Sequence, residues 1–487
     1  MSANGTKRSL HRTHRPRVGA DPDASSSPSA GCSVDTTIVL RVDTQRHRTA
    51  ALAAVVAELD AHLGDVITLH SGDVHAVRRV GLRTRDDAHT ALVLTAIRAI
   101  PGITIQTVSD AVIDCHRGGK IKQTSRIPLR TVEDLRHIYT PGVARVATAI
   151  RNRPAWALEL TGIGNSVGIF TNGTRVLGLG DIGPLASMPV MEGKSVLYEE
   201  LIGISATPIL IDTKDPSVFV ETVLRIAPTF AGIHLEDIRS PDCFFIEEEL
   251  SRRLRRPVLH DDQHGTATVA LAAVIRACEL TGIRLRSACV GQIGLGAAGS
   301  AIARLVARFG VGRVLVTDVS SAAVDRVMQE GIQAASLETV LREADIVIAT
   351  TGKGGLIFPQ CVRRGQVILA LSNPDPEIDP DAARNAGAAF AADGRSINNA
   401  LAFPGLFRGA FKAQSRAIVP EMLLAAARAI AGAARDEEIV PDVLNRGVHA
   451  AVAQAVADKA KELGLRRTLI VDDAWTVQDG DATPGPH

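Results

Sequence analysis

Apolar and polar residues follow two alternating patterns in the N-terminal part of this chain. Four segments alternate as half-buried strands do, and they cover residues 36–42, 66–71, 75–84 and 102–109. Two segments between them place apolar residues at helical spacing, at residues 49–63 and 87–100. The order of strand, helix, two strands, helix and strand predicts a βαββαβ ferredoxin-like module at residues 34–115.

A different pattern, in which strands and helices simply alternate, occupies a later part of the chain. Strand-like runs cover residues 286–294, 313–318, 344–352 and 366–374. Helical patterns follow the first two of these runs, at residues 297–310 and 322–330. This alternation predicts a Rossmann-type, doubly wound parallel sheet at residues 283–418.

The remaining segments complete the predicted organisation, which is that of an α/β protein with several domains. We expect a second α/β domain at residues 116–282 and Ala-rich C-terminal helices at residues 419–472. Residues 1–33 are rich in Arg, Ser and Pro and predict a disordered tail, with an organellar transit peptide as the weaker alternative. Residues 473–487 predict a second tail.

Composition narrows the classes of protein to which the chain can belong. Of its 487 residues, 46% are hydrophobic and 3% aromatic, which excludes a mostly disordered or fibrous chain. The net charge of +1 gives no support for nucleic acid as the main partner. No apolar run approaches the ~18–20 residues of a membrane helix, so we expect no membrane partner. Six cysteines without a CxxC pair predict free thiols in a reducing, cytoplasmic compartment.

The pattern GxGxxG occurs twice, and only one copy has the surroundings of a dinucleotide site. The first copy, Gly178 to Gly183, is followed by Pro184 and a segment that we interpret as a loop. The second lies between a predicted strand and a predicted helix, and the next strand ends at Asp318. A carboxylate there accepts bonds from ribose hydroxyls and repels a 2′-phosphate, which predicts NAD as cofactor. The predicted contacts come from Gly294, Gly296, Ala297, Ala298, Gly299 and Asp318.

Two predicted strands of the middle region end in pairs of carboxylates. Glu236 and Asp237 follow the run AGIHL, and Asp261 and Asp262 follow PVLH. Ligands bind to α/β sheets where strands give way to loops. Clustered carboxylates are favourable around a hard cation, so the pairs predict a Mg²⁺ or Mn²⁺ site. The alternative is helix capping, because HDDQHGTATVAL opens a helix and capping explains one of the aspartates.

The chain offers few tyrosines and lysines for general acid–base chemistry, with two of the former and nine of the latter. Tyr139 precedes Thr-Pro-Gly at a predicted helix start, and Lys194 follows a predicted glycine loop. Arg175 begins a predicted strand. The alternatives are packing for Tyr139 and a solvated position for Lys194. We interpret Tyr198 as a packing residue beside Lys194.

Together these motifs resemble those of the malic enzyme family, from about Gly118 to about Leu465. The matching segments are YTPGVA, VLGLGDIG, VMEGK, DTKDP, APTF, GIHLED, HDDQHGTA, GLGAAG, NPDPE and INNALAFPG. The resemblance implies oxidative decarboxylation of (S)-malate to pyruvate and CO₂ with reduction of NAD, in the presence of Mn²⁺ or Mg²⁺. It also implies a homo-oligomer, either a homodimer or a larger assembly.

The resemblance implies roles for individual residues. The metal ligands of the family correspond to Glu236, Asp237 and Asp262. Lys194 matches the general base that takes the C2 hydroxyl proton, with a pKa lowered by a neighbouring cation, and Asp261 is its partner. Tyr139 matches the acid that protonates C3, and Arg175 the clamp on a substrate carboxylate. Amides on the substrate and nicotinamide sides correspond to Asn373, Asn398 and Asn399, the first of which also counts among the cofactor contacts.

Some features depart from the family pattern and keep alternatives open. The N-terminal module resembles a regulatory ACT domain, which would bind a small-molecule effector, but its loop DTQRHRT lacks the usual glycine. A structural or dimerising role is therefore the alternative. Met188 replaces the first lysine of the usual ASKPVMEGK, and ADGRSINN lacks a few residues before INN. The other functions to consider are a malolactic or oxaloacetate-decarboxylating relative and a catalytically weakened regulatory protein.

Overall fold

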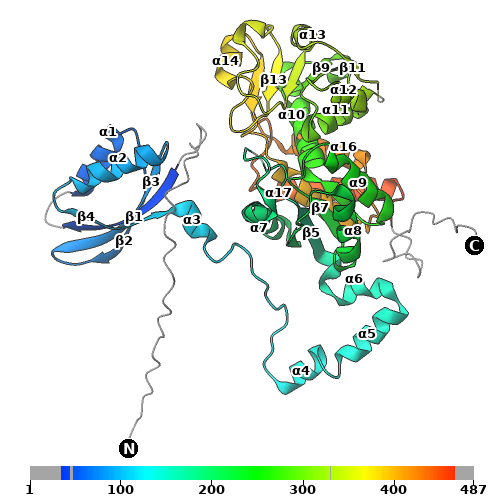
Figure 1. Cartoon of the computed structure of the whole chain (residues 1–487), viewed down its shortest axis with the longest axis horizontal. Coiled ribbons are helices and arrows are strands. Elements are labelled where there is room, and N and C mark those ends of the chain that lie inside the picture. The colour runs from blue at the N-terminus through cyan, green and yellow to red at the C-terminus, as the bar shows by residue number, and fades with distance from the viewer. Residues whose placement is uncertain (1–33, 44–47, 177, 329–330, 467–487) are drawn as a thin grey trace, which may run out of the picture. The chain divides into compact units, whose positions relative to one another are not determined.

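The chain folds into two compact units, divided between Ala111 and Val112 (Figure 1). The computed structural model describes residues 34–43, 48–176, 178–328 and 331–466. The predicted tails lie outside these residues, as do the last residues of the predicted C-terminal helices and most of the loop DTQRHRT. The domain boundaries predicted after residues 115, 282 and 418 stay predictions.

The first unit is an antiparallel sheet with two helices packed on one face. Its elements are β1 (Val34–Asp43), α1 (Arg48–Glu58), β2 (His62–Ser71), β3 (His75–Thr84), α2 (Asp87–Arg98) and β4 (Ile103–Asp110). The strand order is β2-β3-β1-β4. Alternate residues of β1, among them Ile38, Leu40 and Val42, are buried in the core that α1 and α2 cover. The predicted order of elements is confirmed, and the resemblance to an ACT domain stays a prediction.

Short helices with little buried surface follow the first unit along the chain. They are α3 (Ala111–His116), α4 (Val132–Ile138), α5 (Val143–Asn152) and α6 (Ala157–Leu160). Thr131 and Asp134 form a capping box that starts α4. No residue of α4 or α5 is buried, so their helical structure is not explained by packing within the described chain.

A parallel sheet of order β6-β5-β7-β8 carries the two carboxylate pairs. Its elements are β5 (Ser166–Thr171), α7 (Gly183–Ile202), β6 (Ser205–Leu210), α8 (Pro216–Ile226), β7 (Gly232–Leu235), α9 (Asp242–Arg253), β8 (Val258–His260) and α10 (Thr266–Thr281). A π-helical turn, Asp261–Gly265, joins β8 to α10. The sheet thus presents the ends of β7 and β8 side by side.

The predicted Rossmann-type sheet is confirmed. Its strands are β9 (Cys289–Ile293), β10 (Arg313–Thr317), β11 (Gln333–Ala334), β12 (Ile346–Ala349), β13 (Val367–Ala370) and β14 (Phe390–Asp393). All pair in parallel in the order β11-β10-β9-β12-β13-β14, which is the doubly wound order of dinucleotide-binding domains. The helices are α11 (Ala297–Phe309), α12 (Ser321–Val327), α13 (Leu337–Glu343) and α14 (Pro380–Asn385).

Three C-terminal helices complete the core of the second unit. They are α15 (Phe403–Lys412), α16 (Pro420–Ala433) and α17 (Arg446–Glu462). One hydrophobic cluster joins them to α7, α10 and the Rossmann-type sheet, so both parallel sheets share a core. Within the described ranges, no helix is long and apolar enough to cross a lipid bilayer. The five cysteines found there are free thiols, as predicted: Cys115, Cys243, Cys278, Cys289 and Cys361.

Candidate active site

The two carboxylate pairs meet at the carboxyl ends of β7 and β8. Glu236 and Asp237 directly follow β7, and Asp261 and Asp262 directly follow its neighbour β8. Carboxylate oxygens of Glu236, Asp237 and Asp262 lie within 4.8 Å of one another. Asp262 Oδ2 also accepts a hydrogen bond of 3.0 Å from the backbone amide of Asp237. The structure therefore brings together the three residues that the resemblance assigns to a metal.

The alternative that an aspartate caps α10 is wrong. No side chain caps the Asp261–Gly265 turn or the start of α10. Asp261 is instead buried, and its Oδ2 accepts a hydrogen bond of 2.5 Å from Lys194. A Cβ on Gly265 would lie 1.7 Å from Asp261 Oδ1, so only glycine leaves room for this carboxylate. π-Helical turns of this kind are frequent at functional sites.

Lys194 reaches the carboxylates from the middle of a helix and not from a loop. The loop predicted after Gly183 is wrong, because Gly183–Ile202 forms the single helix α7, in whose first turn Pro184 is tolerated. Lys194 Nζ lies 2.5 Å from Asp261 Oδ2 and 3.1 Å from Glu236 Oε1. It also lies 4.7 Å from the centre of the Phe403 ring. The solvated position weighed for Lys194 is therefore wrong.

Burial and mutual repulsion control the charges of this cluster. Burial, reinforced by the neighbouring carboxylates, raises the pKa of Asp237 to about 9 and that of Asp262 to about 6. Burial alone would lower the pKa of Lys194, but Asp261 and Glu236 outweigh it and raise that pKa above its ordinary value. A lowered lysine pKa, as the resemblance implies, therefore needs positive charge beyond that of the described side chains.

Two carboxylate oxygens of the cluster are suited to a cation. Asp237 Oδ2 and Asp261 Oδ1 are buried and have no hydrogen-bond partner among the described residues. Asp237 also has φ of 55°, a strained conformation for a non-glycine residue that is concentrated at functional sites. The ligand set consists of oxygen atoms alone, which suits Mg²⁺ or Mn²⁺ better than Zn²⁺. The residues present therefore fit such an ion.

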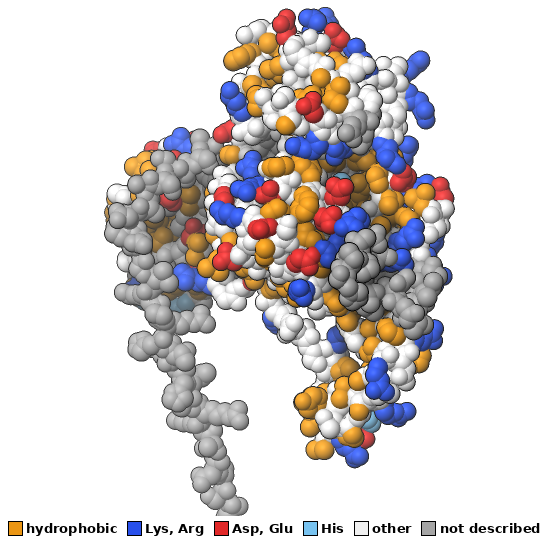
Figure 2. All heavy atoms as spheres, turned by 45° about the vertical axis from the view of Figure 1, so that its right-hand side comes forward, with side chains coloured by type: hydrophobic (Ala, Val, Ile, Leu, Met, Phe, Trp, Pro, Cys, Tyr) orange, Lys and Arg blue, Asp and Glu red, His pale blue; other side chains and the backbone are white. Residues whose placement is uncertain are grey.

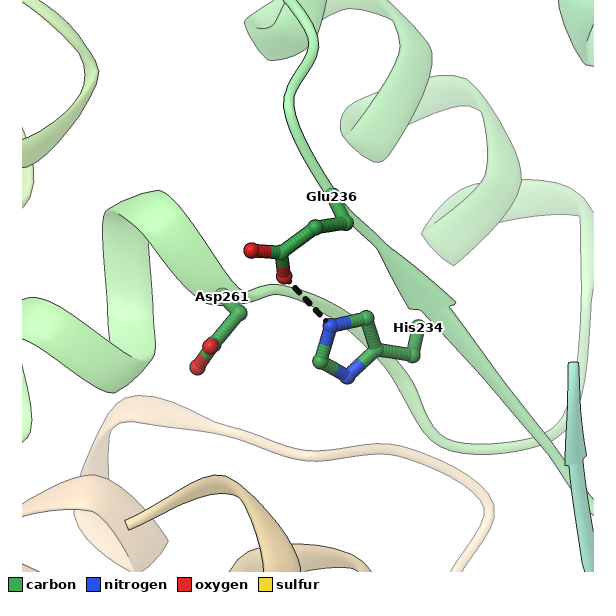
Figure 3. A group of neighbouring side chains, drawn as sticks. All are labelled: His234, Glu236 and Asp261. Carbon is green, nitrogen blue, oxygen red and sulfur yellow. Dashed lines mark hydrogen bonds and ion pairs between the residues drawn. The ribbon is translucent and has the colours of Figure 1, made fainter. Parts of the chain in front are cut away.

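Two buried side chains extend the cluster: His234, which sequence reasoning missed, and Tyr198, which it interpreted as a packing residue beside Lys194. Figure 3 shows His234 next to Glu236. His234 Nε2 lies 2.7 Å from Glu236 Oε2, and the Tyr198 hydroxyl lies 2.9 Å from His234 Nδ1. Burial lowers the pKa of His234 to about 3. Spacing could have found His234, because His234 and Glu236 face the same way along a strand. Tyr198 lies one helical turn from Lys194, which agrees with its predicted place beside that residue.

Tyr139 and Arg175 are placed differently from the carboxylates. Tyr139 follows the end of α4 and is 66% exposed, and its described hydrogen bonds are backbone bonds to Leu135 and Val143. Arg175 does not begin a strand as predicted, but lies in a bend between β5 and α7. Its amide donates to the carbonyl of Asp237 at 3.1 Å, so its backbone borders the cluster. The structure brings the backbone of Arg175 to the carboxylates, while a nitrogen of its guanidinium lies 3.8 Å from the position of a Cβ on Gly352.

The second GxGxxG copy has the geometry of a dinucleotide loop. Gly294 has φ of 86°, and a Cβ on Gly299 would lie 1.9 Å from Gly294 O. A Cβ on Gly296 would meet nothing within 4 Å, which leaves space for a pyrophosphate. Asp318 Oδ2 accepts from the amide of Leu295 at 2.6 Å, next to this loop. The first copy, Gly178 to Gly183, also precedes a helix, α7. The loop predicted after it is therefore wrong and does not distinguish the two copies.

The three predicted amides have different surroundings, and one of them borders the carboxylate cluster. Asn373 Nδ2 is 2.6 Å from the position of a Cβ on Gly394. Asn399 Cβ is 3.6 Å from the corresponding position on Gly265, so it borders the turn that carries the carboxylates. Asn398 Oδ1 accepts from the amide of Ala400 at 2.9 Å and so stabilises the backbone turn.

Known proteins resemble the chain over most of its length. Residues 118–217 match the family described as "Malic enzyme, N-terminal domain", and residues 391–461 match "Malic enzyme, NAD binding domain". NAD-dependent malic enzyme 1 of Bacillus subtilis (strain 168) is 51% identical over 411 residues, which are 84% of this chain and 94% of that protein. The chain belongs to the malic enzyme family. Residues 258–353 also match the NAD binding domain of D-isomer specific 2-hydroxyacid dehydrogenases.

Further relatives and solved structures agree with membership in the malic enzyme family. The NAD-dependent malic enzyme of Geobacillus stearothermophilus is 39% identical, over 90% of this chain and 96% of that protein. The crystal structure of NAD-dependent malic enzyme from Thermotoga maritima has a TM-score of 0.67 and 37% identity, over 72% of this chain and 99% of that one. The Pyrococcus horikoshii malic enzyme has a TM-score of 0.68 and 39% identity, over 72% and 88%.

Proposed function

We propose that this member of the malic enzyme family converts (S)-malate to pyruvate and CO₂, with NAD as the hydride acceptor and Mg²⁺ or Mn²⁺ as the required cation. The observation that supports this most strongly is the buried Lys194, which lies between Asp261 and Glu236 beside two further carboxylates. A base next to a cation site is what the oxidation of a 2-hydroxy acid requires. The names of the relatives support the same reaction.

In this proposal Lys194 accepts the C2 hydroxyl proton of malate while a hydride leaves C2. Asp261 Oδ2, at 2.5 Å, holds the amine in place for that transfer. The cation would be held by Glu236, Asp237 and Asp262, and when bound it supplies Lewis-acid stabilisation of the negative charge on the 2-keto oxygen as CO₂ leaves. The guanidinium of Arg175, whose backbone borders the cluster, binds a carboxylate of malate through its planar fork. The amide of Asn399, beside the same turn, completes the substrate side.

The preference for NAD is assigned to Asp318. Its carboxylate follows β10 and is oriented by two backbone amides, those of Leu295 at 2.6 Å and Ser320 at 2.8 Å. Each carboxylate oxygen keeps a lone pair for a ribose hydroxyl, and the charge repels the 2′-phosphate of NADP. The cofactor would thus lie on the loop of Gly294 and Gly296, at the carboxyl edge of the Rossmann-type sheet.

The acid that protonates C3 is Tyr139 of a second copy of the chain in this proposal. The α4 and α5 segment buries none of its own residues and exposes apolar side chains, which Figure 2 shows in orange among basic ones. The exposed apolar residues are Val132, Leu135, Ile138, Tyr139 and Val143. A second copy that covered this segment would bury them and complete a site that lacks its acid.

Hybrid oligomers test this assignment. Tyr139→Phe and Lys194→Met chains are expected to be nearly inactive when each is purified alone. If the tyrosine acts across subunits, co-expression of the two in equal amounts restores about a quarter of the wild-type sites, because half of the dimers are hybrids and each has one intact site. If Tyr139 acts within its own chain, the co-expressed mixture stays inactive.

Product analysis tests the reaction itself. Incubation of the full chain with malate, NAD and Mn²⁺ is expected to yield pyruvate and NADH in equal amounts, and EDTA is expected to abolish both. Lactate without net NADH would instead support the malolactic alternative. That outcome has a named precedent in a Bacillus subtilis "Bifunctional malic/malolactic enzyme", which is 39% identical over 72% of this chain. No turnover of malate under any of these conditions would support the catalytically weakened alternative.

A further inference from the structure

We propose that Tyr198 and His234 are positioning residues that fix the orientation of Glu236 through a hydrogen-bonded chain running in one direction. The inference rests on the proposed function, in which Glu236 holds the cation. It extends that function to two side chains that touch neither substrate nor cation. Both are fully buried, at 0% exposure, and neither has another role in the proposed chemistry.

The chain of contacts begins on α7 and ends at the carboxylate. The Tyr198 hydroxyl lies 2.9 Å from His234 Nδ1, and His234 Nε2 lies 2.7 Å from Glu236 Oε2. The other oxygen of Glu236, Oε1, lies 3.1 Å from Lys194 Nζ. Figure 3 shows the imidazole of His234 in contact with one oxygen of the Glu236 carboxylate. Each oxygen of Glu236 therefore has a different and fixed partner.

The direction of the hydrogen bonds follows from the chemistry of the groups. An ionised carboxylate paired with a lysine only accepts hydrogen bonds, so His234 Nε2 carries the proton and donates it to Glu236. A neutral imidazole has a single N–H, which leaves Nδ1 as an acceptor for the hydroxyl of Tyr198. Tyr198 thus selects the tautomer that orients Glu236. A ring nitrogen of His234 lies within 4.8 Å of carboxylate oxygens of Glu236 and Asp261. In the proposal both ring nitrogens are engaged by Tyr198 and Glu236, so His234 supports the ligand Glu236 and does not bind the cation itself.

Aromatic packing keeps the imidazole from rotating. Phe407 stacks against the His234 ring with centroids 6.1 Å apart and an interplanar angle of 27°. Phe403 contacts it edge to face at 5.4 Å, and Tyr198 does so at 5.7 Å. A rigid donor of this kind orients a metal ligand in many proteins, and its loss costs about 10–100-fold in metal affinity or activity. Tyr198 lies one helical turn after Lys194, so α7 positions both the proposed base and the tyrosine that contacts His234.

Direct binding of Mn²⁺ to the full chain tests the proposal without turnover. The electron paramagnetic resonance signal of free Mn²⁺ gives the Kd of each variant in the absence of malate and NAD. We expect His234→Leu to raise this Kd about 10–100-fold and Tyr198→Phe about 3–10-fold. We expect His234→Gln to bind more tightly than His234→Leu, because its amide can still donate to Glu236.

The double variant separates a relay from simple packing. If Tyr198 acts only through His234, adding Tyr198→Phe to His234→Leu leaves the Kd unchanged. Independent losses that add would overturn the relay. Phe219→Leu, a buried change on α8 in a separate hydrophobic cluster, is the control for destabilisation. It is expected to lower the thermal unfolding midpoint but not the Mn²⁺ affinity, and an equal loss of affinity there would also overturn the proposal.

Glu236→Gln distinguishes failure of the relay from failure of the proposed function. If Glu236→Gln weakens Mn²⁺ binding while Tyr198→Phe and His234→Leu stay within about twofold of the wild type, the relay is wrong and the cation site stands. If Glu236→Gln itself leaves the Kd unchanged, the assignment of Glu236 to the cation is wrong, and the proposed function loses its metal site.

Discussion

The two parallel sheets of the second unit carry their candidate sites at the carboxyl ends of their strands. One site is formed mainly by backbone atoms and the other by charged side chains. Around Gly294 and Gly299 the site consists mainly of backbone, shaped by a positive φ and by the absence of side chains. Around Glu236 it consists of buried charged side chains that arrive from α7, β7 and β8. The first is a short continuous segment, whereas Lys194 and Asp261 are 67 residues apart.

This difference determines how each site responds to change. A backbone site depends on local geometry, so one added methyl group either blocks the ligand or strains the turn. A site of buried charges depends on the pairing of opposite charges, because burial of each ion costs free energy that only its attraction to a partner offsets. Loss of one member therefore affects all the others. We expect larger effects at the carboxylate cluster than at the nucleotide loop, and the following variants test this ranking.

The largest effect is expected for Lys194→Met. It removes the proposed base and the positive charge between Asp261 and Glu236, so kcat for malate oxidation should fall by about 10²–10⁴-fold. Steady-state kinetics at saturating malate, NAD and Mn²⁺ measure this. The exposed Lys461→Met on α17 is the matched control and should behave as the wild type. A kcat for Lys194→Met within about tenfold of the wild type would remove Lys194 from the chemistry.

The second largest effect is expected for Gly265→Ala. Its Cβ would lie 1.7 Å from Asp261 Oδ1, so the carboxylate must move away from Lys194 and kcat should fall by about 10²-fold. In the control Gly432→Ala, on α16, the new Cβ meets nothing within 4 Å. That variant should keep full activity and gain about 0.5–1 kcal/mol in the free energy of unfolding. Equal activities of the two variants would show that the position of Asp261 is unimportant.

At the nucleotide loop, Gly296→Ala and Gly299→Ala should separate binding from folding. Gly296→Ala meets no protein atom within 4 Å, so it should raise KM for NAD by about tenfold and leave the thermal unfolding midpoint unchanged. Gly299→Ala places a Cβ 1.9 Å from Gly294 O and should lower that midpoint. If both variants lose stability equally, the space beside Gly296 is not a ligand space.

The smallest effect is expected for Asp318→Ser. It removes the charge that repels a 2′-phosphate but keeps a hydroxyl, so the ratio of kcat/KM for NAD to that for NADP should fall by roughly tenfold or less. For each variant, kcat/KM with NAD and kcat/KM with NADP are measured on the same purified preparation. Asp325→Ser, on the neighbouring α12, serves as the control and should leave the ratio unchanged. An unchanged ratio for Asp318→Ser would contradict its assignment to the ribose.

The prediction that failed most clearly concerns α7, and its failure has a physical cause. Its buried face contains Ser187, Lys194 and Ser195 besides apolar residues, so the helical period is hidden when only hydrophobicity is followed. Helix propensity is also weakened by Pro189 and Gly193 within the segment. The helix forms because tertiary contacts bury that face, and the same contacts make Lys194 a buried residue.

The sequence alone predicted the order of strands and helices along both α/β patterns, the dinucleotide loop and the four carboxylates, because each depends on a short contiguous stretch whose backbone geometry follows from local residue types. Only the tertiary structure decided that Lys194 lies on a helix between two carboxylates and that the Tyr198 hydroxyl contacts the His234 ring. It also decided that Tyr139 is exposed. These facts depend on which side chains of distant segments share a low-dielectric interior, and no local pattern encodes that convergence.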